Sequence, residues 1–183
     1  MSMGKKLCFW PFGYNSFHCD VTGLLNANGK NNVLAVRLEN RPQSSRWYPG
    51  AGLYRNVRLV TTERVHVPVW GTQLTTPHVS AEYASVRLRT TIRNAGDADV
   101  RISTDIIAPD GKIVARKDNS RKINHGQPFE QNFLINAPSL WSPETPYLYK
   151  AVSKIYVDGK QTDEYTTRFG IRSIEIIADK DSS

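Results

Sequence analysis

The stretch SSRWYPGAGLYRNVRLV, from Ser44 to Val60, decides the fold. It joins neighbouring aromatic side chains to two glycines that permit a tight turn, and it then enters a segment where Val57 and Leu59 alternate with polar residues. The glycines do not form a dinucleotide-binding fingerprint, because no strand–turn–helix context surrounds them. The stretch therefore predicts a loop that leads into a β-strand over residues 56–62.

Alternation of apolar and polar residues continues outward from this loop in both directions, and no long amphipathic helix interrupts it. Two strands are expected before the loop. Their inward faces would be Phe17, Cys19 and Val21 in the first, and Leu34, Val36 and Leu38 in the second. The pattern indicates an all-β chain.

From Glu63 onward the strands become short and regularly spaced, which is typical of a β-sandwich. Seven strands are expected, and residues 161–168 are a candidate eighth. The seven are Val65 to Trp70, Gln73 to Val79, Ala84 to Asn94, Val100 to Ala108, Lys112 to Lys117, Phe129 to Asn136, and Tyr147 to Val157. Pro68 lacks an amide donor, so the first of them is expected at an edge or a bulge.

Four sequence blocks, in the same order as in the family, carry a resemblance to family 2 glycoside hydrolases. Ser44 to Val60 resembles the hinge between two β-domains of that family. The matching residues are Arg46, Trp47, Tyr48, Pro49, Gly50, Gly52, Leu53, Tyr54 and Arg55. The other blocks are GYNSFHCDVTGLLNANGKNNVLAVRLEN before the hinge, and LWSPETPYLYKAVSKIYVDGK and RFGIRSIEI after it.

This resemblance implies an order of domains. Residues 1–62 would be the C-terminal part of a jelly-roll (galactose-binding-like) sugar-binding domain, and residues 63–178 an immunoglobulin-like β-sandwich. Residues 179–183 would begin the linker to a catalytic barrel that lies outside this chain. The chain is thus expected to be a fragment of a β-galactosidase-like enzyme, truncated on both sides.

Retaining glycoside hydrolysis needs two carboxyl groups about 5 to 5.5 Å apart across one sugar bond. In the family both are barrel glutamates, the acid following an asparagine, and this chain has no Asn-Glu dipeptide. Its own carboxylates suit turns and exposed strand positions. The four histidines are scattered, and two cysteines cannot complete a tetrahedral metal set. We therefore expect no catalytic residue, no metal and no cofactor.

The candidate substrate-binding residues are Arg46, Trp47 and Tyr48, acting only together with the barrel. Aromatic faces suit sugar C–H groups, and a guanidinium can donate paired hydrogen bonds to hydroxyls or carboxylates. In relatives this loop lies at the mouth of the barrel, and an aspartate often stands where Arg46 is found. The alternative is that the two aromatic side chains pack between domains and that Arg46 forms a salt bridge. This alternative is favoured.

The charge and hydropathy of the chain argue against two classes of partner, membranes and nucleic acids. The formal net charge is +7 and the mean hydropathy −0.46, with no apolar run of the ~20 residues that a membrane span needs. Basic residues alternate along strands, as Arg87 and Arg89 do on the solvent face, which argues against nucleic acid. The sequence predicts no location. Cys8 and Cys19 could form a disulfide in a periplasmic protein, but a buried free thiol is favoured.

The predicted function is that of a non-catalytic portion of a family 2 glycosidase, which acts as a spacer and supports the substrate pocket. Carbohydrate would be its ligand in the full-length context, and the barrel its neighbour. Alternatives are a stand-alone carbohydrate-binding module and a structural immunoglobulin-like protein. Unpaired strand edges of an incomplete jelly roll would also favour self-association.

Overall fold

The computed structural model describes residues 5–26, 30–43, 50, 52–93, 96, 98–122 and 127–175. The chain divides into two compact units, Met1–Leu59 and Val60–Ser183. Each unit is described by itself. In the described ranges no helix has the length and apolar character that crossing a lipid bilayer requires.

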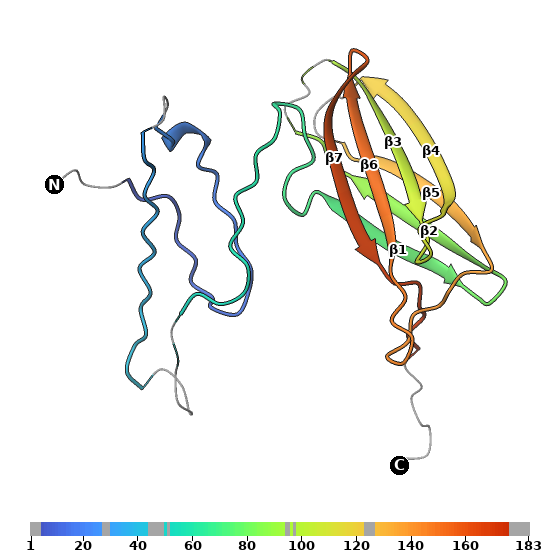
Figure 1. The fold of residues 1–183 in the computed structure, drawn as a ribbon, viewed down its shortest axis with the longest axis horizontal. Helices are drawn as coiled ribbons and strands as arrows, with labels where there is room; N and C mark the ends of the chain where they lie inside the picture. The colour runs from blue at the N-terminus through green and yellow to red at the C-terminus, as the bar shows by residue number, and fades with distance from the viewer. Residues whose placement is uncertain are drawn as a thin grey trace. The chain divides into compact units, whose positions relative to one another are not determined.

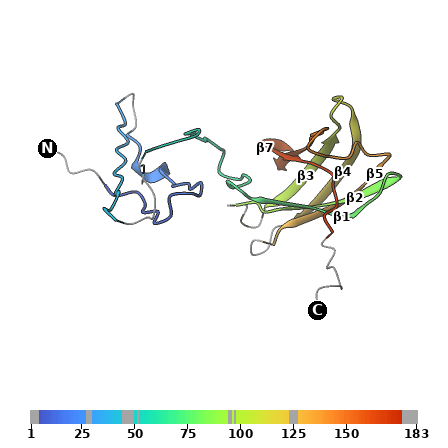
Figure 2. The ribbon, with the colours of Figure 1, turned by 90° about the horizontal axis from the view of Figure 1, so that it is seen from below.

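The second unit is an antiparallel β-sandwich, whose two layers face each other in Figures 1 and 2. One sheet has the strand order β1-β2-β5, and the other β4-β3-β6-β7. The strands are β1 Thr72–Val79, β2 Tyr83–Thr90, β3 Asp99–Ile107, β4 Ile113–Lys122, β5 Phe129–Asn136, β6 Tyr149–Val157 and β7 Lys160–Phe169. The predicted all-β sandwich is confirmed.

Alternating burial explains why these segments form strands. Along β5, residues at odd positions are buried and those at even positions are exposed, so one face of the strand joins the core. The inward side chains of both sheets form two apolar clusters, centred on residues such as Leu88, Ile102, Ile106 and Ile155, all fully buried. Burial of this apolar surface between the layers holds the sheets together.

A two-residue turn joins β6 to β7. Val157 pairs with Lys160, and the residues between them, Asp158 and Gly159, have φ angles of 49° and 78°. Positive φ at both central positions matches the twist of the strands that flank a tight hairpin, and Asp-Gly is a favoured pair for it. The candidate eighth strand expected over residues 161–168 is β7.

The strand expected at Val65 to Trp70 does not form. His66 makes only an isolated bridge with Arg93, and the Gly71 amide donates to the carbonyl of Pro68 in a turn. Of the three alternating valines in this segment only Val67 is buried, and the proline removes a donor that a ladder would need. The segment is instead fixed by its Val67 amide, which donates to Asp163 Oδ2 on β7 at 2.8 Å.

Strand β4 is longer than predicted. The expected strand ended at Lys117, but the polar residues Asp118 to Lys122 also pair with β3. Arg101 on β3 donates to Asp118 Oδ1 at 3.0 Å. An edge strand such as β4 can carry charged side chains, because part of its surface faces solvent.

A buried polar cluster joins the two sheets. Gln131 on β5, Thr104 on β3 and Ser153 on β6 are almost fully buried. Thr104 Oγ1 donates to Gln131 Oε1 at 2.7 Å and lies 2.8 Å from Ser153 Oγ. Gln131 Nε2 donates to the carbonyl of Lys117 and to Asn119 Oδ1 on β4, both at 3.1 Å. Gln131 thereby connects the edge strand β4 to the opposite sheet.

The described part of the first unit contains one short 3-10 turn, Thr22–Leu24, and no strand. The strands expected around Cys19, around Val36 and over residues 56–62 do not form, so these predictions are wrong. The apolar side chains that would have formed their inward faces are mostly exposed, for example Leu34 at 63% and Leu59 at 76%. A strand needs a paired neighbour and a covered face, and the described residues of this unit supply neither.

Cys8 and Cys19 form a disulfide, with their Cα atoms 6.2 Å apart. The favoured free thiol is therefore wrong. Cys19 was placed on the buried face of a strand, whereas the unit has no buried residue in its described ranges and Cys19 is only half-buried. A covalent link is a common means of ordering a segment that has little apolar core.

Candidate functional site

The predicted binding residues Arg46, Trp47 and Tyr48 lie outside the described residues. The aromatic residues earlier in the same unit are described, and they form two ring pairs. Trp10 stacks on Phe17 with ring centroids 6.0 Å apart, and Phe12 meets Tyr14 edge-on at 5.8 Å. All four rings are largely exposed. Aromatic surfaces of this kind can contact the apolar faces of sugars.

The two C-terminal family blocks interlock at one end of the sandwich. The Trp141 amide donates to the carbonyl of Ile171 at 2.9 Å, and the Arg172 guanidinium lies 4.5 Å from the centre of the Trp141 ring. A Cβ atom on Gly170 would meet the Trp141 ring at 2.9 Å. The Trp141 side chain is half-buried in this contact, whereas Leu148 is exposed.

Several of the described carboxylates are engaged in structural contacts. Asp105 forms a paired contact with the guanidinium of Arg116, with a 2.9 Å distance from Nη2 to Oδ2. This hydrogen bond lowers the pKa of Asp105 below its usual 3.8. The Lys112 ammonium likewise lowers the pKa of Asp110. A general acid for glycoside hydrolysis needs the opposite shift.

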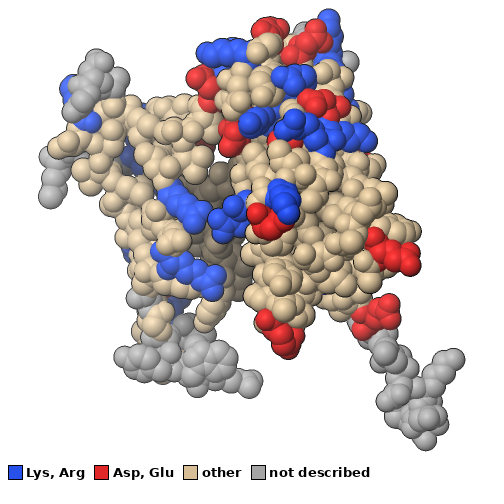
Figure 3. Space-filling model, turned by 45° about the vertical axis from the view of Figure 1, so that its right-hand side comes forward, with Lys and Arg blue, Asp and Glu red and all other residues tan. Residues whose placement is uncertain are grey.

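No metal-binding cluster of three or more His, Cys, Asp or Glu side chains occurs in the described ranges. On the face of the sandwich that Figure 3 presents, basic and acidic side chains intermingle near one end and do not form a field of one sign. Between β6 and β7, Lys154 and Glu164 form a local ion pair at 4.0 Å.

The described surface is hollowed on the outer face of the three-stranded sheet. Two shallow depressions, of about 130 and 230 Å³, adjoin along β1 and β2 and share Gln73 and Arg89 in their walls. Thr75 and Arg87 line one end, and Gly71, Thr91 and Pro128 lie at the other. We call this feature the β1–β2 trough. Sequence reasoning placed Arg87 and Arg89 on the solvent face but missed the trough, because the trough depends on the register between β1 and β2 and on Pro128 just before β5.

Comparison with known proteins identifies the family. The model of a family described as glycosyl hydrolases family 2 matches residues 66–172, more than half of the 183 residues. The chain belongs to glycoside hydrolase family 2. The matched span runs from the segment before β1 to the residues just after β7, and so covers the sandwich.

Family 2 relatives match over nearly the whole chain. A β-galactosidase of Bacteroides ovatus is 39% identical over 182 residues, covering 97% of this chain and 21% of that protein. A β-glucuronidase of Formosa agariphila is 31% identical over 196 residues, covering 93% of this chain and 19% of that protein. The chain thus spans about a fifth of the length of these curated relatives.

Solved family 2 structures share the fold. The crystal structure of a family 2 member from Bacteroides cellulosilyticus superimposes with a TM-score of 0.57 at 32% identity. The match covers 62% of this chain and 15% of that one.

Proposed function

We propose that this chain is a non-catalytic β-domain portion of a family 2 glycosidase of the β-galactosidase type, which hydrolyses O-glycosidic bonds with retention. The observation that carries the proposal is the match of nearly the whole chain to about a fifth of the Bacteroides ovatus β-galactosidase. In this proposal the sandwich is a spacer, and the first unit supports a substrate pocket completed by a catalytic barrel.

The immunoglobulin-like assignment of residues 63–178 is part of this proposal. Its support is a 3+4 arrangement of antiparallel strands in which β5 returns to the sheet of β1 and β2. A second support is Tyr149, the first residue of β6, whose hydroxyl accepts a hydrogen bond from the Ser139 amide at 2.8 Å. A tyrosine bonded back to the preceding connection is a known feature of such sandwiches. The jelly-roll assignment of residues 1–62 rests on the sequence resemblance.

Arg46, Trp47 and Tyr48 are the residues proposed to border the substrate. Trp47 and Tyr48 would offer ring faces to a sugar, and Arg46 would donate hydrogen bonds to its hydroxyl or carboxylate groups. Their role requires the barrel, because a spacer and one loop cannot enclose a glycoside on all sides.

The test has two arms. The purified chain is incubated with aryl β-galactosides and aryl β-glucuronides, and no turnover is expected. In the second arm this chain replaces the matching segment of the Bacteroides ovatus β-galactosidase, and the chimera should hydrolyse aryl β-galactosides, with Trp47→Ala raising KM. Turnover by the chain alone that survives removal of contaminants, or a folded chimera without activity, would refute the proposal.

A carbohydrate-binding module is the second candidate, favoured by the exposed Trp10–Phe17 and Phe12–Tyr14 ring pairs. It predicts affinity of the isolated chain for neutral oligosaccharides, lost on Trp47→Ala, which calorimetric titration measures. Self-association is a related proposal, because the first unit exposes many large apolar side chains. Light scattering across a concentration series would detect it.

A further inference from the structure

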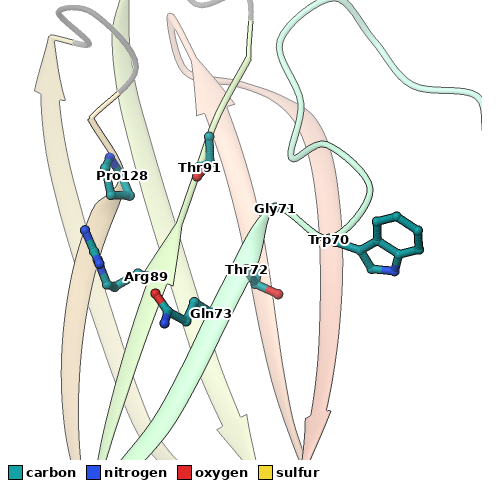
Figure 4. A pocket seen from close by; sticks show the side chains of 7 residues that line it. All are labelled: Trp70, Gly71, Thr72, Gln73, Arg89, Thr91 and Pro128. Atoms are coloured by element: carbon teal, nitrogen blue, oxygen red, sulfur yellow. The ribbon is translucent and has the colours of Figure 1, made fainter. Parts of the chain in front are cut away.

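The β1–β2 trough is lined by alternating cationic and hydrogen-bonding side chains. In the strand register Thr75 stands opposite Arg87, and Gln73 opposite Arg89. Two residues along a strand correspond to ~7 Å, so each guanidinium has a polar neutral neighbour in its own row. Figure 4 shows Arg89 and Gln73 on the same side of the sheet with Pro128 beyond Arg89, whereas the Trp70 indole points away.

The guanidinium groups are only weakly neutralised. On the other side of β2, Glu130 lies 3.7 Å from Arg87 Nε and 3.9 Å from Arg89 Nε, distances too long for hydrogen bonds. All three side chains are about half-exposed. Arg87 Nε also donates to Asn132 Oδ1 at 3.4 Å. The two half-exposed guanidinium groups thus share one carboxylate and keep further donors available to a ligand. Such donors match carboxylate and sulfate groups in paired geometry.

Two further cations flank the trough on the β5 side. Lys117 Nζ lies 3.5 Å from the carbonyl of Asn132, the residue opposite Arg87. Arg121 Nη2 donates to the carbonyl of Pro128 at 2.7 Å, and Pro128 lines the other end. Four cationic side chains thus line or flank the trough beside the single Glu130 carboxylate, and this excess of positive charge favours an anionic ligand.

The shape of the trough favours a chain over a compact anion. From the row of Thr75 and Arg87 to the row of Gly71 and Thr91 is four residues, or ~14 Å along the strands. The depression is open and shallow, so it cannot enclose a single small ion. Hydroxyl and amide groups beside spaced cations suit a polymer that presents hydroxyls along its length and an anion at intervals.

We infer that the β1–β2 trough binds an acidic oligosaccharide, with Arg87 and Arg89 pairing with its carboxylate or sulfate groups and with Gln73 and Thr75 contacting its hydroxyls. This site is built from residues other than Arg46, Trp47 and Tyr48. It would hold an acidic glycan on the sandwich.

The full chain is titrated calorimetrically with an oligogalacturonate, a sulfated heparin oligosaccharide, a neutral galacto-oligosaccharide and a short duplex DNA. Binding of the uronate is expected in low salt and should weaken severalfold at ~0.3 M salt, because screening shortens the reach of exposed charges. The sulfated probe tells whether the trough accepts both anions or carboxylate alone, and either result supports the inference. Tighter binding of DNA, equal binding of the neutral probe, or no binding of either acidic probe would overturn it.

Variants locate the site. Arg87→Gln and Arg89→Gln should each weaken uronate binding about tenfold. Arg168→Gln is the matched control, since it removes the same charge from an exposed position on β7 of the other sheet, and it should change affinity less than about twofold. Glu130→Gln should strengthen binding, because it removes the competing carboxylate. Equal losses of uronate affinity in Arg87→Gln and Arg168→Gln would mean that the ligand is attracted by net charge alone, and this result would refute the inference.

Discussion

Replacing Gln131 by leucine should destabilise the sandwich although the two side chains are similar in size. Gln131 is fully buried and makes three hydrogen bonds, one through Oε1 to Thr104 and two through Nε2 to the Lys117 carbonyl and Asn119. Each such bond contributes about 0.5–1.5 kcal/mol net, so the loss of all three should cost about 2–4 kcal/mol.

The direction of the hydrogen bonds makes the cluster sensitive to a single change. Thr104 has one hydroxyl hydrogen, which it donates to Gln131 Oε1, so Ser153 must be the donor to Thr104. Thr104→Val should therefore cost about 1–3 kcal/mol by stranding its buried partners. The double variant removes donor and acceptor together, and its cost should fall below the sum of the single costs by about 1–2 kcal/mol.

Urea unfolding followed by circular dichroism gives these free energies. Asn132→Leu is the control, because Asn132 is the next residue on β5, points outward and should change stability by less than about 0.5 kcal/mol. Additive costs in the double variant would refute the reasoning, since the two side chains would then stabilise the fold independently.

Two further variants test the packing and the charge pairs. Gly170→Ala should lower the free energy of unfolding by about 1–3 kcal/mol, because its Cβ would lie 2.9 Å from the Trp141 ring, whereas Gly23→Ala meets nothing within 4 Å; equal urea midpoints would contradict this. The Arg116 hydrogen bond lowers the folded-state pKa of Asp105. At pH values above the usual pKa of 3.8 this pair therefore stabilises the protein, and the stabilisation is lost as the pH falls through the lower folded-state pKa. Asp105→Asn should therefore be less stable than the parent at neutral pH and lose less stability on acidification, and parallel pH profiles of the two proteins would exclude the pair as a source of acid sensitivity.

Local pattern predicted the sandwich well where one face of a strand is apolar. The bounds of Phe129–Asn136 agree with the expected strand, and the candidate strand over residues 161–168 forms as β7. The prediction of strand bounds failed where pairing with a neighbouring strand decides whether a segment becomes a strand. The polar half of β4 gains its partners from β3, and Val65 to Trp70 alternates without a neighbour to pair with.

The functional residues show the same division. The outward direction of Arg87 and Arg89 follows from alternation along one strand, and the buried neighbours Val86 and Leu88 confirm it. Their combination with Gln73 depends on the register between strands, which no single segment encodes. The pairing of Cys8 with Cys19 was missed for a related reason, since burial was inferred from a strand that does not form.

The contact between Trp141 and residues 170–172 has a mechanical consequence. Trp141 holds the backbone that leaves β7 in three ways. Its amide donates a hydrogen bond to Ile171, its ring packs against Gly170, and the Arg172 guanidinium lies over its ring. These contacts fix the direction in which the backbone leaves β7. Repacking of the Trp141 ring would therefore change the direction in which residues 173–175 leave the sandwich.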